Sequence, residues 1–534
     1  MSRARLARLA PLGAAAALGA ILSLSQAPLS AWPLLFLGLP AVFLLQLRAS
    51  PRRAALIGWL FGVGYFLPGL LWIGEAFLVD AETFGWMRPF AVTLLPMGLA
   101  LFWALAFAAA AAATRRLAGA PSDAAAPPER PMIAAAALAA SWSLAEYARG
   151  TVLTGFPWGM FGFAWIDTPT AQIAAHVGPY GLTAVTITAA LALGAAAATA
   201  GAARRASAAL GVGLPLLALA IGAARLAPAA TATDAPVIRL VQPNVPQEEK
   251  WAPVFVARNY QRLISLSALA PEPGAEAPSL VVWPETATRP EHVYDADLRV
   301  RMAAGALALA PEQRLVMGTQ RFDRWFEPDA TARQGWFNAL FAIGPDGRIE
   351  AIYDKHHLVP FGEYLPAQGL LESLGMRQLA GRMGGFRAGR GPRTIALHGG
   401  LRALPLICYE AIFPWAARAS DARPDLLLQI TNDAWFGDSG GPRQHLAQAR
   451  MRAIEQGLPL LRAANTGVSA AIDPYGRITD RLDLGRTGAI DVQPTTPLPP
   501  TLYAQAGDVT YLPIVVAQLL LITFIFKYSR VRNR

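Results

Sequence analysis

The sequence predicts a multi-pass α-helical membrane bundle of eight spans that carries one α/β domain. Hydrophobic residues make up 54% of the 534 residues, charged residues 15%, and the mean hydropathy is +0.35. These values are too apolar for a soluble protein of this length. Apolar stretches long enough, or nearly so, to cross a bilayer recur along the chain. Residues 235–495 interrupt them with an ordinary soluble composition.

The charge of the connections between apolar stretches predicts the topology. The stretches cover residues 8–27, 30–47, 55–76, 90–114, 131–148, 174–200, 206–226 and 509–527. Every second connection is basic, through Arg3, Arg5, Arg8, Arg52, Arg53, Arg115, Arg116, Arg130, Arg204, Arg205 and the tail after Lys527. Because cytoplasmic loops retain positive charge, we expect both termini inside and the α/β domain outside.

The first stretch also has features of a signal peptide, namely an Arg-rich start, an Ala-rich core and a possible cleavage site at 24–27. Further spans follow, and the charge pattern requires an even number of them, so we expect an uncleaved anchor. The predicted domains are a seven-helix transmembrane bundle (1–230), the α/β domain (235–495), and a linker with the eighth span and a basic cytoplasmic tail (496–534).

The net charge of +10 does not indicate a nucleic-acid partner, because much of it lies in short flanks where topology and anionic lipid account for it. The general richness in Ala and Gly hides any distinct Gly-x-x-x-Gly face, so we expect a monomer. Nothing in the sequence calls for a cofactor.

Short β-branched or Leu-rich runs alternate with helical stretches in residues 235–495, which is typical of an α/β domain. Candidate strands are 237–241, 280–283, 315–318, 339–343, 349–353, 404–407, 426–430 and 460–463, and candidate helices are 254–270 and 446–456. The segments 345–349 and 473–478 resemble two hairpin turns of one type. They predict two similar halves.

Three reactive side chains follow three of these strands: Glu285, Lys355 and Cys408. Sites in α/β domains form just beyond the carboxyl ends of strands. A thiol must lose its proton before it attacks, and Glu285 can accept that proton. Lys355, with a backbone N–H next to Cys408, can stabilise the oxyanion formed on an ester or amide. Only three of the 46 basic residues are lysine, which indicates that Lys355 supplies a needed compact ammonium.

Other interpretations of these residues remain open. Cys408, the only cysteine, could be a small buried hydrophobe, and Lys355 could lie in an exposed charged turn. His356 and His357 could pair with the thiol, but adjacent histidines on an extended segment point in opposite directions. No carboxylate spacing completes a ligand set with them, so we expect no metal site.

The contexts of the three residues resemble the carbon–nitrogen hydrolase (nitrilase) superfamily. These contexts are WPET (283–286), YDKHHLVPFGEY (353–364) and ICYE (407–410). TNDAWFGD (431–438), RMRAIE (450–455), TGFPW (154–158) and QPNVPQ (242–247), with the flanking spans, resemble its membrane-bound apolipoprotein N-acyltransferase family. The resemblance covers nearly the whole chain and implies an αββα sandwich on eight transmembrane helices.

The resemblance implies a role for several positions. Glu285 resembles the general base, Lys355 the oxyanion-stabilising lysine and Cys408 the acyl-carrying nucleophile. Supporting or substrate-binding positions are Glu363, Tyr409, Glu410, Trp251, Asn432 and Trp435. Alternatives for this last group are core aromatics (Tyr409, Trp435), an arginine ion pair (Glu410) and a simple turn (Asn432).

The reaction implied by the resemblance is ping-pong acyl transfer in the bacterial inner membrane, with the α/β domain in the periplasm. A phospholipid, expected to be phosphatidylethanolamine, would acylate Cys408, and the α-amine of a diacylated apolipoprotein would accept the chain. A membrane-tethered amidase or nitrilase for a small soluble amide is the first alternative, although it gives no reason for eight spans. A transporter or assembly factor is the second, although few charges lie within the spans.

Overall fold

The structure is a computed structural model that describes residues 3–118, 130–230, 235–323, 335–373, 379, 385–418 and 421–532. The chain divides into two compact units. The helical unit comprises Met1–Gly74, Met87–Leu226 and Thr501–Arg534, and the α/β unit comprises Glu75–Trp86 and Ala227–Pro500.

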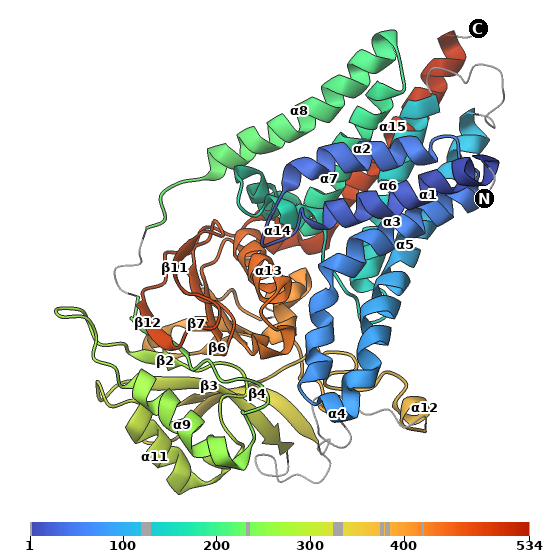
Figure 1. Cartoon of the computed structure of the whole chain (residues 1–534). Coiled ribbons are helices and arrows are strands. Elements are labelled where there is room, and N and C mark those ends of the chain that lie inside the picture. Colours follow the sequence, from blue (N-terminus) through green and yellow to red (C-terminus); the bar gives the residue numbers. More distant parts are fainter. Residues whose placement is uncertain are drawn as a thin grey trace. The chain divides into compact units, whose positions relative to one another are not determined.

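A helix lies on each of the eight apolar stretches of the sequence (Figure 1). These helices are α1 (Arg3–Ser23), α2 (Leu35–Gln46), α3 (Pro51–Gly69), α5 (Arg88–Ala118), α6 (Arg130–Thr151), α7 (Ala174–Ala197), α8 (Gly201–Arg225) and α15 (Leu512–Arg532). Shorter helices and 3₁₀ turns connect them, among them α4 (Ala81–Phe84) and α14 (Leu502–Ala506).

Length and hydropathy identify fewer spans than eight. Within the described residues, four helical stretches are long and apolar enough to cross a membrane: Ala81–Ala118, Pro169–Ala197, Gly201–Arg225 and Leu502–Lys527. A fifth is present if Pro51–Gly69 and Leu71–Leu78, bent by 48°, form one span, whereas Leu9–Ser23 and Trp32–Gln46 are shorter. The chain therefore has the apolar helices of a membrane protein, and the count of eight stays a prediction.

A buried ion pair orders the centre of the helical unit. Arg149 Nη2 lies 2.7 Å from Glu146 Oε2, and Trp103 Nε1 donates to Glu146 Oε1 at 2.6 Å. Arg149 Nη1 donates to the carbonyl oxygens of Phe156 (2.6 Å) and Trp158 (2.8 Å). These bonds satisfy backbone groups that are otherwise costly in an apolar interior. They hold the TGFPW segment against the end of α6.

Two six-stranded sheets form the α/β unit. The first has the order β12-β1-β2-β3-β4-β5, with β1 (Ile238–Gln242), β2 (Leu280–Val282), β3 (Arg314–Phe322), β4 (Trp336–Ile343), β5 (Ile349–Asp354) and β12 (Gly488–Val492). The second has the order β11-β10-β9-β8-β7-β6, with β6 (Ile395–Ala396), β7 (Arg402–Ile407), β8 (Leu426–Thr431), β9 (Leu460–Ala464), β10 (Ser469–Ile472) and β11 (Ile478–Leu482). Neighbours are parallel within β1-β2-β3 and within β7-β8-β9.

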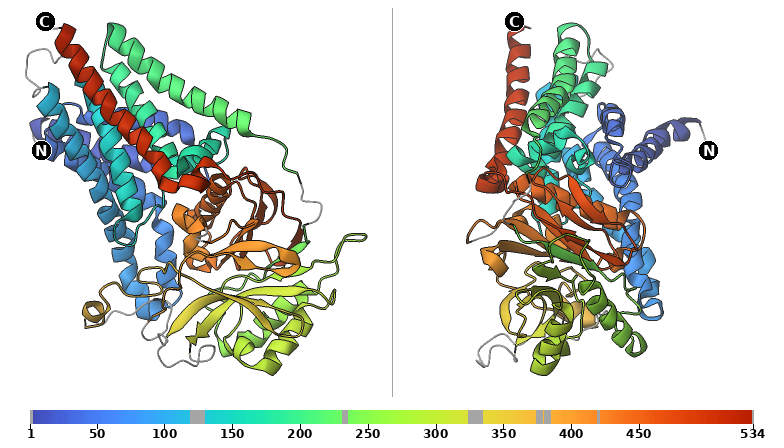
Figure 2. Two further views of the ribbon diagram at one scale, coloured as in Figure 1. Left: turned by 180° about the vertical axis from the view of Figure 1, so that it is seen from behind. Right: turned by 90° about the vertical axis from the view of Figure 1, so that its left-hand side faces the viewer.

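The alternation of side chains explains how the sheets and helices form layers. Successive residues of a strand point to opposite faces. Val282 therefore packs in a core shared with residues of the second sheet such as Ile407, whereas Val281 faces Leu263 of α9 (Pro253–Ser267) and Met302 of α11 (Ala296–Ala306). Helix α13 (Gly440–Gln456) contacts β9 of the second sheet. Figures 1 and 2 show this order of helix, sheet, sheet and helix.

The two predicted hairpin turns have the same hydrogen bonds. Gly344 N donates to Arg348 O at 2.9 Å, and Asp473 N donates to Arg477 O at 2.9 Å. Gly347 and Gly476 share a φ of +77°, a left-handed conformation that favours glycine. Each hairpin supplies the outermost strand of its sheet, β5 or β11.

Candidate active site

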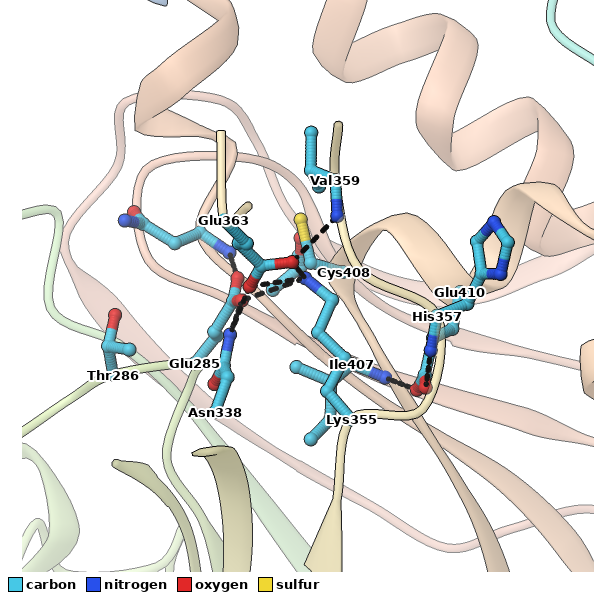
Figure 3. A network of polar contacts seen from close by, with 12 residues as sticks. Glu285, Thr286, Asn338, Lys355, His357, Val359, Glu363, Ile407, Cys408 and Glu410 are labelled. Atoms are coloured by element: carbon cyan, nitrogen blue, oxygen red, sulfur yellow. Dashed lines mark hydrogen bonds and ion pairs between the residues drawn. The ribbon is translucent and has the colours of Figure 1, made fainter. Parts of the chain in front are cut away.

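Glu285, Lys355 and Cys408 follow β2, β5 and β7, so both sheets contribute to one site. All three side chains are buried, with exposed fractions of 5%, 1% and 6%. Figure 3 shows Glu285, Lys355 and Glu363 directed toward one another. The structure thus brings together the three residues that the strand pattern predicted, with Glu363 as a fourth.

Two carboxylates share the Lys355 ammonium. Lys355 Nζ lies 3.0 Å from both carboxylate oxygens of Glu363 and 3.6 Å from Glu285 Oε1. Burial by itself lowers the pKa of Lys355, but Glu363 and then Glu285 outweigh it and raise that pKa. The ammonium therefore stays protonated and can stabilise a negative charge beside it. The exposed-turn alternative for Lys355 is wrong.

Asn338, on β4, links the two carboxylates. Its Nδ2 donates to Glu285 Oε1 at 2.7 Å and to Glu363 Oε1 at 3.0 Å. The backbone N–H of Asn432 donates to Glu285 Oε2 at 2.9 Å, and the Asn432 side chain donates to Gln247 Oε1 at 2.6 Å. Asn432 is therefore more than a turn residue, because its backbone N–H holds the second carboxylate oxygen of Glu285.

Cys408 occupies a strained position directly after β7. Its φ is +50°, a conformation that is uncommon for residues other than glycine and that recurs at functional sites. Burial, and next the charge of Glu285, raise the pKa of the Cys408 thiol, whereas Lys355 lowers it. The resting group is therefore the thiol, which needs a base before it can act as a nucleophile.

A second buried cluster holds the backbone of Cys408. His445 Nε2 lies 3.0 Å and Gln429 Nε2 3.3 Å from the Cys408 carbonyl oxygen. His445 Nδ1 lies 3.0 Å from Asp433 Oδ1, and Arg462 Nη2 pairs with Asp433 Oδ2 at 2.5 Å. Burial opposes ionisation of Asp433, but Arg462 and His445 hold its pKa at about 2.

Glu410 joins the loop after β5 to the turn at Cys408. It is fully buried, and its oxygens accept from the backbone N–H groups of Ile407 and His356, both at 2.7 Å. His356 Nδ1 lies 2.6 Å from Glu410 Oε1, and His357 packs against Phe413 with ring centroids 4.1 Å apart. The partners of Glu410 are thus backbone N–H groups and a histidine, whereas the alternative interpretation expected an ion pair with an arginine. Within the described residues, no cluster of three or more His, Cys, Asp or Glu side chains could hold a metal ion.

The aromatic candidates differ in position. Tyr409 is buried between His357 and Phe413, and burial raises the pKa of its phenol, which fits the core-aromatic interpretation. Trp251 and Trp435 are partly exposed. Among the hydrogen bonds of the described residues, none joins the indole of Trp251 or Trp435 to Glu285, Lys355 or Cys408.

Sequence reasoning missed Asn338, His445 and Lys250. Asn338 is the one polar residue of an otherwise apolar strand, WFNALFAI, which is a usable signal. Lys250 is one of only three lysines among the 46 basic residues. The rarity of lysine, which drew attention to Lys355, could therefore have indicated Lys250 as well. Its Nζ donates to the backbone carbonyl of Glu285 at 3.1 Å.

The fold and the match to known families define the class of protein, a carbon–nitrogen hydrolase domain joined to an apolar helical domain. Residues 237–496 match the family described as carbon–nitrogen hydrolase, and residues 18–192 match the apolipoprotein N-acyltransferase N-terminal domain. A solved amidase from Nesterenkonia sp. aligns at 19% identity and a TM-score of 0.35, over 53% of this chain and 97% of that chain.

Relatives extend the match to nearly the whole chain. It is 41% identical to an apolipoprotein N-acyltransferase of Rhodopseudomonas palustris over 94% of this chain and 93% of the relative. It is 37% identical to one of Brucella melitensis over 96% of this chain and 95% of the relative. The chain belongs to the apolipoprotein N-acyltransferase family and is an acyltransferase, which confirms the resemblance seen in its sequence motifs.

Proposed function

We propose that this chain transfers a fatty acyl chain from a phospholipid, through a thioester on Cys408, to the N-terminal α-amine of the diacylglyceryl-cysteine of apolipoproteins. This is the last step of lipoprotein maturation. One observation carries the proposal for the site: the only cysteine lies strained and buried beside a lysine that is paired with two carboxylates. The names of the relatives support the acceptor class.

In the first half-reaction Glu285 takes the proton of the Cys408 thiol, and the thiolate attacks the ester carbonyl of the phospholipid. Lys355 and the backbone N–H next to Cys408 stabilise the oxyanion. The carbon–oxygen bond then breaks, and the leaving lysophospholipid oxygen takes the proton from Glu285. The acyl chain remains on sulfur as a thioester.

In the second half-reaction the neutral α-amine of the acceptor attacks the thioester. Glu285 accepts the amine proton, the carbon–sulfur bond breaks, and Glu285 returns that proton to the leaving thiolate of Cys408, which restores both groups. Water competes with the amine, so the site has to favour the lipid-borne acceptor. Burial of its acyl chains contributes about 0.8 kcal/mol per CH₂.

Supporting roles follow for the other residues. Glu363 orients Lys355 and assists proton transfer, Glu410 holds the two site loops together, and Asn432 fixes Glu285. Trp251 and Trp435, both partly exposed, are proposed to contact the lipid substrates, and Tyr409 is proposed to line the substrate site beside Cys408. The proposed donor is phosphatidylethanolamine.

The arrangement proposed in the cell follows the charge pattern. Residues 1–230 and the helix within 496–534 form eight spans of the inner membrane, residues 235–495 act in the periplasm, and both termini are cytoplasmic. The enzyme is proposed to act as a monomer.

A transfer assay tests the function. The purified enzyme is incubated with phosphatidylethanolamine and a synthetic diacylglyceryl-cysteine peptide with a free amino terminus, and peptide mass is followed. We expect one added acyl chain on the amine, absent with Cys408→Ala. Ammonia release from small soluble amides without acylated peptide would instead establish the tethered-amidase alternative.

A further inference from the structure

Lys250 is a buried cation that the mechanism above does not use. It lies in the loop before α9, its exposed fraction is 7%, and its Nζ donates to Glu285 O at 3.1 Å and to Thr286 Oγ1 at 2.9 Å. A lysine is almost never buried to this extent unless its charge is compensated. A functional requirement therefore has to account for its position.

The contacts of Lys250 fall on a strained turn. Thr286 has a φ of +46°, a conformation that costs free energy in a β-branched residue. Glu285 directs its carboxylate toward Asn338 and Lys355 from that turn. A donor that bonds both the carbonyl of Glu285 and the hydroxyl of Thr286 holds the turn in place, and with it the direction of the carboxylate.

The charges of the site give a second, independent argument. Glu285 and Glu363 face the single ammonium of Lys355, so the buried group has one negative charge in excess. Transfer of the Cys408 proton to Glu285 leaves this total unchanged, so the thiolate and the Glu363 carboxylate then face the same single ammonium, which is unfavourable. The titratable groups that act on the Lys250 ammonium are Glu285 and Cys408, and the Trp251 ring lies 5.9 Å from it. Lys250 therefore supplies the missing positive charge.

We propose that Lys250 is a positioning residue of this active site, which fixes the turn at Glu285 and Thr286 and neutralises the site when the Cys408 proton moves to Glu285. This inference rests on the proposed function and adds a residue to it. Burial lowers the pKa of Lys250 to about 8, although Glu285 and Cys408 act in the opposite direction. The cation is thus present at neutral pH and is lost in mildly alkaline solution.

The test uses the full chain in detergent micelles and five variants. Lys250→Met removes the charge at similar length, and Lys250→Arg keeps the charge at every pH. Thr286→Val removes the hydroxyl partner, and Thr286→Ser retains it. Lys527→Met is the matched control, because Lys527 is an exposed lysine of α15.

The first readout is alkylation of Cys408 by iodoacetamide, followed by intact mass from pH 6 to 10. Because the chain has one cysteine, the adduct reports on Cys408 alone. We expect alkylation of Lys250→Met at pH 7 to be about 10-fold slower than in wild type, since a rise of one pKa unit reduces the thiolate fraction tenfold. Lys250→Arg should be alkylated faster than Lys250→Met at pH 7, and Lys527→Met should stay close to wild type.

The second readout is the rate at which phosphatidylethanolamine acylates Cys408. We expect about a 10²-fold loss in Lys250→Met, the size of effect that misplacement of a catalytic group produces, and a smaller loss in Thr286→Val than in Lys250→Met. The ratio of the wild-type rate to the Lys250→Arg rate should fall between pH 7 and 9, because only the wild-type cation loses its proton there.

The proposal is overturned if Lys250→Met matches Lys527→Met in both readouts. It is also overturned if the wild-type to Lys250→Arg ratio is independent of pH and Thr286→Val equals Thr286→Ser. If Lys250→Met does not fold, Lys250→Arg, Thr286→Val and Thr286→Ser still test the role of Lys250. If wild type is not acylated at all, the proposed function fails, while the alkylation series still decides the role of Lys250.

Discussion

Two buried polar clusters lie near Cys408 in the α/β unit, and they differ in the balance of their charges. The residues of one precede Cys408 in the sequence, and the residues of the other follow it. The reacting cluster contains Glu285, Lys355 and Glu363, and the supporting cluster contains Asp433, His445, Arg462 and Gln429. In the supporting cluster one carboxylate meets a guanidinium and an imidazole. In the reacting cluster two carboxylates share one ammonium.

This difference in charge balance suits the supporting cluster to stabilising the fold and the reacting cluster to transferring a proton. Arg462 and His445 keep Asp433 ionised. The ionised carboxylate holds His445 in place, and His445 in turn contacts the carbonyl oxygen of Cys408. Glu285 instead shares the Lys355 ammonium with Glu363, and we propose that it accepts the proton of the thiol. Substitutions in the two clusters should therefore affect different quantities, catalysis in the first and unfolding in the second.

The largest effect is expected for Lys355→Met in the reacting cluster. This change should slow thioester formation by about 10³-fold, because the proposed oxyanion then lacks the ammonium of Lys355. Rapid-quench sampling with intact mass measures the rate, with Lys527→Met as the control. A loss below tenfold would place the oxyanion stabilisation elsewhere.

Arg462→Met in the supporting cluster should act on stability. It leaves Asp433 buried without its guanidinium partner, and breaking a buried pair costs about 3–5 kcal/mol. Thermal unfolding in detergent measures the change. The control is Arg481→Met, whose pair with Asp483 is exposed and contributes about 1 kcal/mol or less. Equal melting temperatures for the two variants would contradict the assignment of this cluster to stability.

The supporting cluster should also make stability depend on pH. The pKa of Asp433 lies at about 2 in the folded protein and near 3.9 in an unfolded chain. On acidification the unfolded state takes up this proton first, so a contribution of about 2–3 kcal/mol is complete above pH 5 and disappears toward pH 2. The difference in melting temperature between wild type and Asp433→Asn should therefore shrink over this interval. A constant difference would show that Asp433 acts through packing alone.

The smallest effect is expected for Asn338→Leu, which removes the shared donor of Glu285 and Glu363. Loss of these hydrogen bonds should slow thioester formation by about 10-fold. Asn338→Asp, of similar shape, adds a third carboxylate and should be slower than Asn338→Leu. The reverse order would mean that the excess of negative charge is unimportant to the reacting cluster.

The pattern of apolar runs in the sequence predicted most strands of the α/β unit, and the strands that it missed differ physically from those that it found. All eight candidate strands are present, since each candidate segment is largely apolar, and all but β5 are mostly buried. The missed strands β6, β10, β11 and β12 are short, Ala-rich or partly exposed, so they lack that pattern. The sequence could place Glu285, Lys355 and Cys408 at strand ends. It could not place Asn338, whose role depends on the antiparallel pairing of β4 with β5.

The helical unit shows a different limit of sequence reasoning. Apolar composition located all eight helices, but it gives neither their length nor their bends, and the apolar helical stretches Leu9–Ser23 and Trp32–Gln46 are shorter than a span normally requires. The ion pair of Glu146 and Arg149 was also not predicted. It forms between two residues of one helix and is satisfied by the carbonyls of a loop whose path only the tertiary structure defines.

Intact-mass analysis of the enzyme incubated with phosphatidylethanolamine alone determines whether Cys408 carries the acyl chain. We expect one added fatty-acyl mass on wild type that hydroxylamine removes, and none on Cys408→Ala. An adduct that persists in Cys408→Ala, or transfer to the lipopeptide without any acylated enzyme intermediate, would contradict the assignment of Cys408 as the acyl carrier.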